Sequence, residues 1–202
     1  MRIKNLTSGA KGYTCNVYLV QGDWDSVDDV NTLIDVGTDD SIIPRIKTSL
    51  TGIGKKTIDQ ILLTHGDHDH IGILSDIKAA FSPIVFAGFT SQLADKKFED
   101  GQSIRVGDKI FAAIYAHTHG NSVCFLCEKE GVIFSGDVPI HMCHEKGSYP
   151  DEFLRFLEFL ASKDIKKIYP GHGEPILKGA EEMITDSLIK AQIAKRDIAV
   201  SP

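Results

Sequence analysis

A chain of 202 residues with 42% hydrophobic and 25% charged residues has the size and composition of one globular domain, which we expect to span residues 1–202. Its formal net charge of −6, with basic residues scattered among acidic ones, argues against a nucleic-acid partner. We find no apolar run of membrane-spanning length and no secretory signal at the N-terminus, so we expect a cytoplasmic protein without a membrane partner.

Strand-like and helical stretches alternate along the first part of the chain. Apolar and β-branched runs predict strands, and apolar residues spaced three or four apart predict helices. The predicted strands are 13–20, 32–36 and 58–63, and the predicted helices are 41–50 and 71–81.

The second part of the chain is richer in short strands. Strands are predicted at 84–87, 103–106, 109–115, 122–127, 131–135 and 165–169, and helices at 180–194 and from an N-cap at Asp151. Cys124 and Cys127 match a C-x-x-C spacing, but residues three apart in a strand face opposite sides, so we expect ordinary packing. The pattern as a whole predicts a single α/β domain with mixed sheets.

A dense group of ligand-type side chains follows strand 58–63. It contains His65, Asp67, His68, Asp69 and His70. Histidine and aspartate suit a core poorly and bind metal cations well. In a loop at the strand end, the alternate residues His65, Asp67 and Asp69 can point the same way, and we expect His70 to begin the next helix.

Three more residues of the same types follow later strands. His117 comes after the strand that ends at Tyr115, Asp137 after the strand 131–135, and His172 after the strand 165–169. The ends of strands at one edge of an α/β sheet are where such folds place their sites. A lone histidine or aspartate is usually structural, but four separate positions of this kind together indicate a metal site.

The segments LLTHGDHDHIG, AHTHGNSVCFL, VIFSGDVP and YPGHGEP, in this order, resemble the motifs of the metallo-β-lactamase superfamily. The opening NVYLV and TLIDVGT are similar to the first strands of that fold, and the resemblance covers roughly residues 13–177. It implies a four-layer αβ/βα sandwich, in which two mixed sheets lie face to face with helices outside. The site would lie along one edge of the two sheets.

The resemblance implies two metal sites with one bridging carboxylate. The first would be His65, Asp67 and His117, the second Asp69, His70 and His172, and Asp137 would bridge them. The family pattern usually has a second histidine where this chain has Asp67. His68 stands beside it and gives a competing register, although the spacing from His65 favours Asp67.

The implied activity is that of a metal-dependent hydrolase, in which a hydroxide bridging two divalent cations attacks a small ester-like substrate such as a lactone or thioester. Asp69 and Asp137 are the residues that we expect to take part in catalysis. Zinc is the expected metal, and iron and manganese are alternatives because carboxylate is a harder ligand than imidazole. Two other functions stay open, a di-iron redox protein that lacks its own flavin domain and a non-enzymatic metal-binding module.

Further polar residues flank the ligand motifs and are candidates for the substrate cleft. They contact substrate or shuttle protons in one interpretation, and belong to a solvated loop in the other. These residues are His119, Asn121, His141, His144 and Tyr149.

Overall fold

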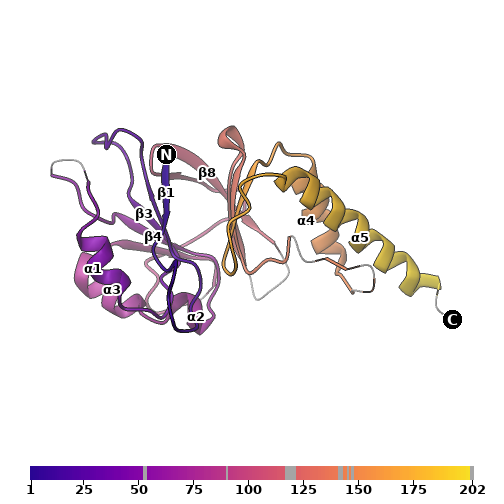
Figure 1. Ribbon diagram of the computed structural model, residues 1–202, viewed down its shortest axis with the longest axis horizontal. Coiled ribbons are helices and arrows are strands. Elements are labelled where there is room, and N and C mark those ends of the chain that lie inside the picture. Colours follow the sequence, from indigo (N-terminus) through magenta and orange to yellow (C-terminus); the bar gives the residue numbers. More distant parts are fainter. Residues whose placement is uncertain are drawn as a thin grey trace.

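Two mixed β-sheets lie face to face, and helices cover both outer faces (Figure 1). The structure is a computed structural model that describes residues 1–51, 54–89, 91–116, 122–140, 143–144, 146 and 148–200, with side chains to residue 196. The four-layer sandwich predicted from the sequence is confirmed.

The first sheet has the strand order β1-β2-β3-β4-β5-β6. Its first three strands pair antiparallel, and β3 to β6 run parallel. The strands are β1 (Arg2–Asn5), β2 (Tyr18–Gln21), β3 (Thr32–Ile34), β4 (Gln60–Leu63), β5 (Ile84–Ala87) and β6 (Lys96–Lys97). The helices of this half are α1 (Ile42–Lys47), α2 (His68–Ile71) and α3 (Leu74–Phe81).

The second sheet has the order β11-β10-β9-β8-β7, with β10 and β11 parallel and the other pairs antiparallel. Its strands are β7 (Ser103–Val106), β8 (Lys109–Tyr115), β9 (Val123–Cys127), β10 (Val132–Gly136) and β11 (Lys167–Pro170). A 3-10 helix, η1 (Glu128–Glu130), joins β9 to β10. Two helices, α4 (Asp151–Ala161) and α5 (Ala180–Val200), pack on the outer face.

Three apolar layers hold the sandwich together. Phe111, Phe125 and Phe134 are fully buried between the two sheets, where β-strand side chains of alternating direction from both halves meet. The other two layers lie between each sheet and its helices. Cys124 faces the helices and Cys127 faces the opposite sheet, so the expectation that these two thiols diverge is confirmed.

Some predicted boundaries were wrong. Residues 13–17 lie outside β2, because their backbone pairs with loops that approach from other parts of the chain. The N-cap of α4 is Pro150, since its carbonyl already accepts the first helical hydrogen bonds from Phe153 and Leu154. Asp151 is therefore the first helical residue, where its carboxylate still opposes the helix dipole.

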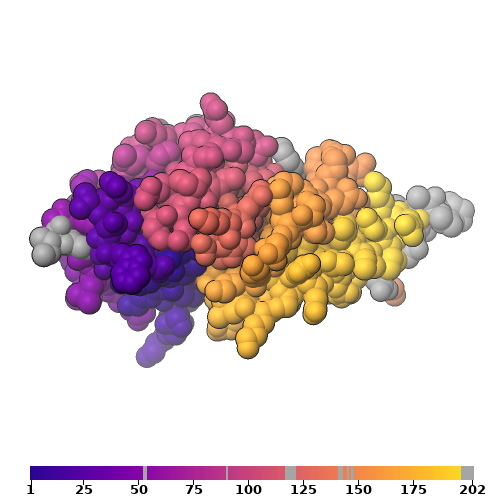
Figure 2. Space-filling view, turned by 90° about the horizontal axis from the view of Figure 1, so that it is seen from above, coloured from indigo at the N-terminus to yellow at the C-terminus, as the bar shows by residue number. Residues whose placement is uncertain are grey.

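The parallel strands bring their carboxyl ends to the same edge of the sandwich. β3 and β4 end there in the first sheet, and β10 and β11 in the second. The backbone N–H of Val123 donates to the carbonyl of Thr64 at 2.8 Å and joins the two sheets at this edge. Figure 2 shows the N-terminal region and helix α5 on opposite sides of the molecule.

Candidate metal centre

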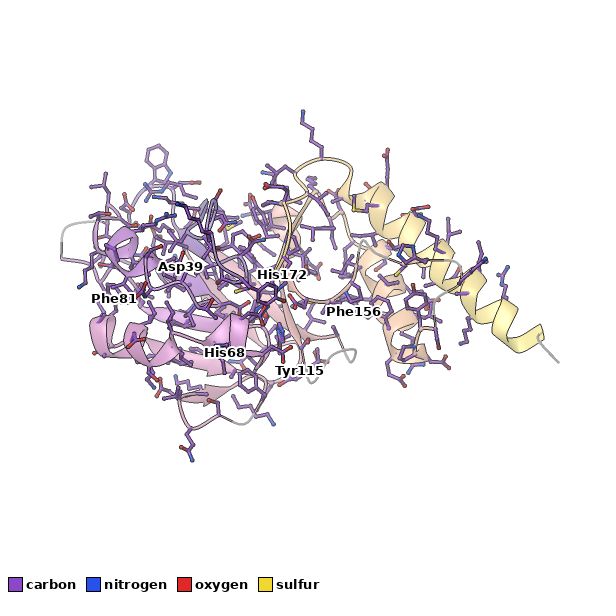
Figure 3. The ribbon with its side chains drawn as sticks, turned by 60° about the horizontal axis from the view of Figure 1, so that its bottom comes forward. Asp39, His68, Phe81, Tyr115, Phe156 and His172 are labelled. Atoms are coloured by element: carbon purple, nitrogen blue, oxygen red, sulfur yellow. The ribbon has the colours of Figure 1, made fainter. Side chains whose placement is uncertain are left out.

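Three strand ends and one short helix bring five of the predicted ligands together. His65 follows β4, Asp69 and His70 lie on α2, Asp137 follows β10, and His172 follows β11. Figure 3 shows His172 at the junction of the two halves, with His68 on the neighbouring helix α2.

Asp137 lies at the middle of this group. Its Oδ1 is 3.2 Å from His70 Nε2, and its Oδ2 is 3.7 Å from His65 Nε2 and 3.6 Å from His172 Nε2. Asp69 Oδ2 is 3.0 Å from His172 Nε2 and 3.9 Å from His70 Nε2. Ligands of one tetrahedral Zn²⁺, each about 2.0–2.2 Å from the ion, would be separated by roughly 3.4 Å. The observed spacings match that separation.

Four ligand-type atoms of this group are buried and, among the described residues, lack hydrogen-bond partners, as expected for atoms that bind a cation. Asp69 Oδ2, His70 Nε2, Asp137 Oδ1 and His172 Nε2 are buried and make no hydrogen bond within the part of the chain that the structure describes. Buried polar atoms nearly always have partners, so four that lack one in the same place need an explanation. Imidazole nitrogen and carboxylate oxygen are ligands of Zn²⁺ and of iron, and a bound cation would satisfy all four.

A buried carboxylate behind the centre orients His70. Asp35 Oδ2 lies 2.9 Å from His70 Nδ1 and accepts a hydrogen bond from Thr64 Oγ1 at 2.8 Å. The Thr64 hydroxyl also lies 3.0 Å from His65 Nδ1. Because Asp35 holds a proton on Nδ1, Nε2 of His70 is the atom left to bind a cation. The sequence prediction missed Asp35, although an aspartate inside the apolar run TLIDV was a visible signal.

The charges of the site shift the pKa values of its members. Burial opposes the charged form of His70, but the nearby carboxylates of Asp35 and Asp137 outweigh it and raise the pKa of His70. Burial likewise opposes ionisation of Asp137, yet the three surrounding histidines lower its pKa. His65 has a lowered pKa because of burial and the neighbouring charge of His70. Asp137 is therefore a carboxylate, as a ligand must be.

Two glycines allow the backbone to reach the centre. A Cβ on Gly171 would lie 2.3 Å from Asp137 Oδ1 and 2.8 Å from His70 Cε1. Gly136 has φ +52°, and a Cβ there would lie 2.7 Å from the Thr64 side chain. The loops carrying Asp137 and His172 therefore pack directly against the residues that they would help to hold.

An exposed aromatic ring stands beside the ligands. Tyr13, 79% exposed, stacks on the His172 ring with centroids 5.5 Å apart and an interplanar angle of 17°. The charge of Asp69, followed by burial, raises the pKa of Tyr13, which is therefore a hydrogen-bond donor at neutral pH. Tyr13 was predicted only as the first residue of a strand, and the structure places it in the loop before β2.

The two candidates for the altered motif position have different surroundings. Asp67 is the N-cap of α2, and its Oδ2 lies 3.7 Å from His65 Nε2. His68 is exposed on the first turn of α2. Asp67 therefore approaches another predicted ligand, whereas His68 faces solvent.

Of the other predicted residues, two are described in the structure and make contacts with each other. His144 and Tyr149 are tied to each other, since the His144 N–H donates to the Tyr149 hydroxyl at 2.7 Å, and the Tyr149 ring packs on Phe153 of α4. Four others, His117, His119, Asn121 and His141, lie outside the described residues.

The first part of the sequence matches a family model. A model of the metallo-β-lactamase superfamily matches residues 10–88, which contain Asp35 and the group from His65 to His70. Over these residues the chain is similar to the metallo-β-lactamase superfamily. A solved structure, ETHE1 from Myxococcus xanthus, matches with a TM-score of 0.69 at 18% identity, and the match covers 100% of this chain and 92% of that chain. That likeness agrees with the fold.

Several relatives that match by sequence are named thioesterases, and others are named lactamase-like proteins. An atrochrysone carboxyl ACP thioesterase of Cryptosporiopsis is 26% identical over 123 residues, which are 59% of this chain and 38% of that protein. The thioesterase pkgB of Emericella nidulans is 26% identical over 122 residues, 60% of this chain and 36% of that protein. The chain thus spans less than two fifths of the length of these two superfamily relatives. Among the described residues, no helix combines the length and apolar character that a bilayer crossing needs.

Proposed function

We propose that this protein is a metal-dependent hydrolase of thioesters that uses two divalent cations, most simply zinc. The observation that carries the proposal is the group of four buried donor atoms without hydrogen-bond partners, contributed by Asp69, His70, Asp137 and His172. Such a group has no favourable state without a cation or a network of water.

The proposed ligand sets follow the distances within the group. Asp69, His70 and His172 would hold one cation, since one donor atom from each lies within 4.8 Å of the others. His65 and Asp67 would hold the second cation together with His117, whose place in the set rests on the sequence motif alone. Asp137 would contact both, because its two oxygens point to different histidines.

Two cations held there would supply a hydroxide at neutral pH and polarise the carbonyl under attack. The residues of the chain would prepare that chemistry. Asp35 fixes the tautomer of His70, and Asp137 remains ionised between the histidines. Three carboxylates among the proposed ligands reduce the positive charge of the centre, which favours a harder cation than a site with only histidines would.

The substrate class comes from the relatives and from the surface beside the centre. Two relatives are named thioesterases, and a thioester carbonyl suits attack by hydroxide without a serine or cysteine nucleophile. The exposed ring of Tyr13, beside His172, offers an apolar face and a hydroxyl donor to an acyl group that binds there.

The experiment combines metal analysis with a substrate panel. The protein would be stripped with a chelator, reloaded with zinc, iron or manganese, and assayed with acyl thioesters, lactones and phosphodiesters. We expect two equivalents of metal and hydrolysis of thioesters that chelation removes and reloading restores. The variant His65→Ala should lose this activity, and Asn31→Ala, which changes a buried residue at the far end of β3, should keep it.

Other outcomes would select other functions. Tight binding of iron with oxygen-dependent spectral changes and no hydrolysis would favour the redox alternative. Full metal loading with no turnover of any substrate class would favour a binding module. Failure to bind metal at all would refute the proposed centre.

A further inference from the structure

The loop that carries His172 belongs to the second sheet, yet a side chain of the first half holds it. Asn16 Nδ2 donates to the carbonyl of Pro170 at 3.0 Å and to the carbonyl of Gly173 at 2.8 Å. These two carbonyls lie on either side of His172 in the sequence. One carboxamide therefore spans the loop 170–173 and uses both of its N–H groups to do so.

Neighbouring groups fix the orientation of that carboxamide. Asn5 Nδ2 donates to Asn16 Oδ1 at 2.8 Å, so the oxygen of Asn16 is engaged and its nitrogen must face the loop. The backbone N–H of Asn16 also donates to the carbonyl of Gly171 at 2.6 Å. The Tyr18 hydroxyl adds a further donor to the carbonyl of Pro170 at 2.8 Å.

We propose that Asn16 is a positioning residue, which holds His172 at the distance from Asp69 that the cation of Asp69, His70 and His172 requires. This inference rests on the proposed metal centre but concerns a residue outside it. The side-chain hydrogen bonds of Asn16 go to Asn5 and to the carbonyls of Pro170 and Gly173, so Asn16 acts on His172 through the loop backbone.

The packing of the loop explains why its position matters. Gly171 lies so close to Asp137 and His70 that a Cβ there would overlap both. The loop can therefore move only outward, and such a movement takes His172 Nε2 away from Asp69 Oδ2, now 3.0 Å distant. Metal ligand distances tolerate deviations of about 0.2 Å, so a small outward shift weakens this site.

A matched pair of variants separates positioning from general stability. Asn16→Ala removes the two donors to the loop, and Asn16→Asp removes them while keeping the shape. Asn31→Ala is the control, because Asn31 Nδ2 makes an equivalent tie to the carbonyl of Lys56 at 2.9 Å, at the end of β3 away from the centre. Both alanine variants lose a buried or half-buried carboxamide that joins two loops.

The first measurement is competition with a chelator for each of the two metal equivalents. We expect Asn16→Ala and Asn16→Asp to weaken the binding of one equivalent about 10- to 100-fold, the range seen when groups that orient a ligand are removed. The other equivalent should bind as in the wild type. Asn31→Ala should lower the unfolding midpoint and leave both equivalents unchanged.

The second measurement needs no metal. The Tyr13 ring stacks on His172, so the proton resonances of the His172 ring carry a ring-current shift in the metal-free protein, which a His172→Gln variant would assign. We expect this shift to change in both Asn16 variants and to persist in Asn31→Ala. Wild-type metal affinities together with an unchanged His172 resonance would overturn the proposal. If the wild-type chain binds no metal, the proposed centre fails, and the resonance alone decides whether Asn16 positions His172.

Discussion

Replacing Gly171 with alanine tests the geometry of the centre most directly. The added Cβ would meet Asp137 Oδ1 at 2.3 Å, whereas ordinary contact begins at 3.4 Å. The carboxylate or the loop must therefore shift by about 1 Å, which is several times the deviation that metal ligand distances tolerate. We expect Gly171→Ala to weaken metal binding at least 10²-fold, because Asp137 is the proposed shared ligand.

Gly173→Ala is the matched control on the other side of His172. Gly173 has φ +81°, and a Cβ there would have no heavy atom within 4 Å. Gly173→Ala should lower the free energy of unfolding by about 1–2 kcal/mol, because alanine disfavours this backbone conformation. Gly171→Ala should lower it by about 1–3 kcal/mol, because the added Cβ overlaps its neighbours. The two variants should thus lose similar stability in thermal unfolding of the metal-free protein.

The assay is metal content after desalting, followed by chelator competition, for both glycine variants and the wild type. We expect Gly173→Ala to retain two equivalents and Gly171→Ala to lose them. A Gly171→Ala protein that keeps both equivalents at wild-type affinity would show that Asp137 and His70 are not confined as described, and the reasoning from this contact would be wrong.

Three further predictions concern the ligands themselves. Asp137→Ala should release both metals, and mass spectrometry that still finds two full equivalents would contradict its shared role. Asp67→Ala should reduce metal content more than His68→Ala does, and the reverse order would establish the competing register. Metal binding should release protons and strengthen as pH rises. Burial by itself would lower the pKa of His70, but the carboxylates of Asp35 and Asp137 outweigh that effect and raise the pKa, so His70 stays protonated until a cation displaces its proton. Calorimetry in buffers of different ionisation enthalpy measures that release, and identical enthalpies would refute it.

The fold was predictable where local patterns are strong. The strands at 84–87, 103–106 and 109–115 were predicted at their observed bounds, since apolar or alternating runs between turn residues specify them. β1 and β6 were missed, because RIKN and KK are polar and become strands only through pairing with β2 and β5. Pairing of this kind depends on the tertiary structure and leaves little trace in a short polar segment.

The sequence predicted the candidate ligands from their residue types. It did not predict the residues that orient those ligands. Ligand-type residues at strand ends were visible because histidine and aspartate stand out after apolar runs. Asp35 stood out as an aspartate inside an apolar run, but its partner could not be identified, because His70 lies 35 positions later. Asn16 could not be recognised, because the carbonyls that it binds lie 154 and 157 positions away and belong to backbone, which carries no sequence signal.

The division of the ligands between the two sheets also orders the events of biosynthesis. His65, Asp69 and His70 leave the ribosome long before Asp137 and His172 have been translated. If these residues hold metal as proposed, a nascent chain offers only part of the set of ligands, and firm binding of metal waits until the second sheet docks. Incorporation of the cofactor would then report that folding is complete, and chains stalled between residues 137 and 172 should remain easy to strip of metal.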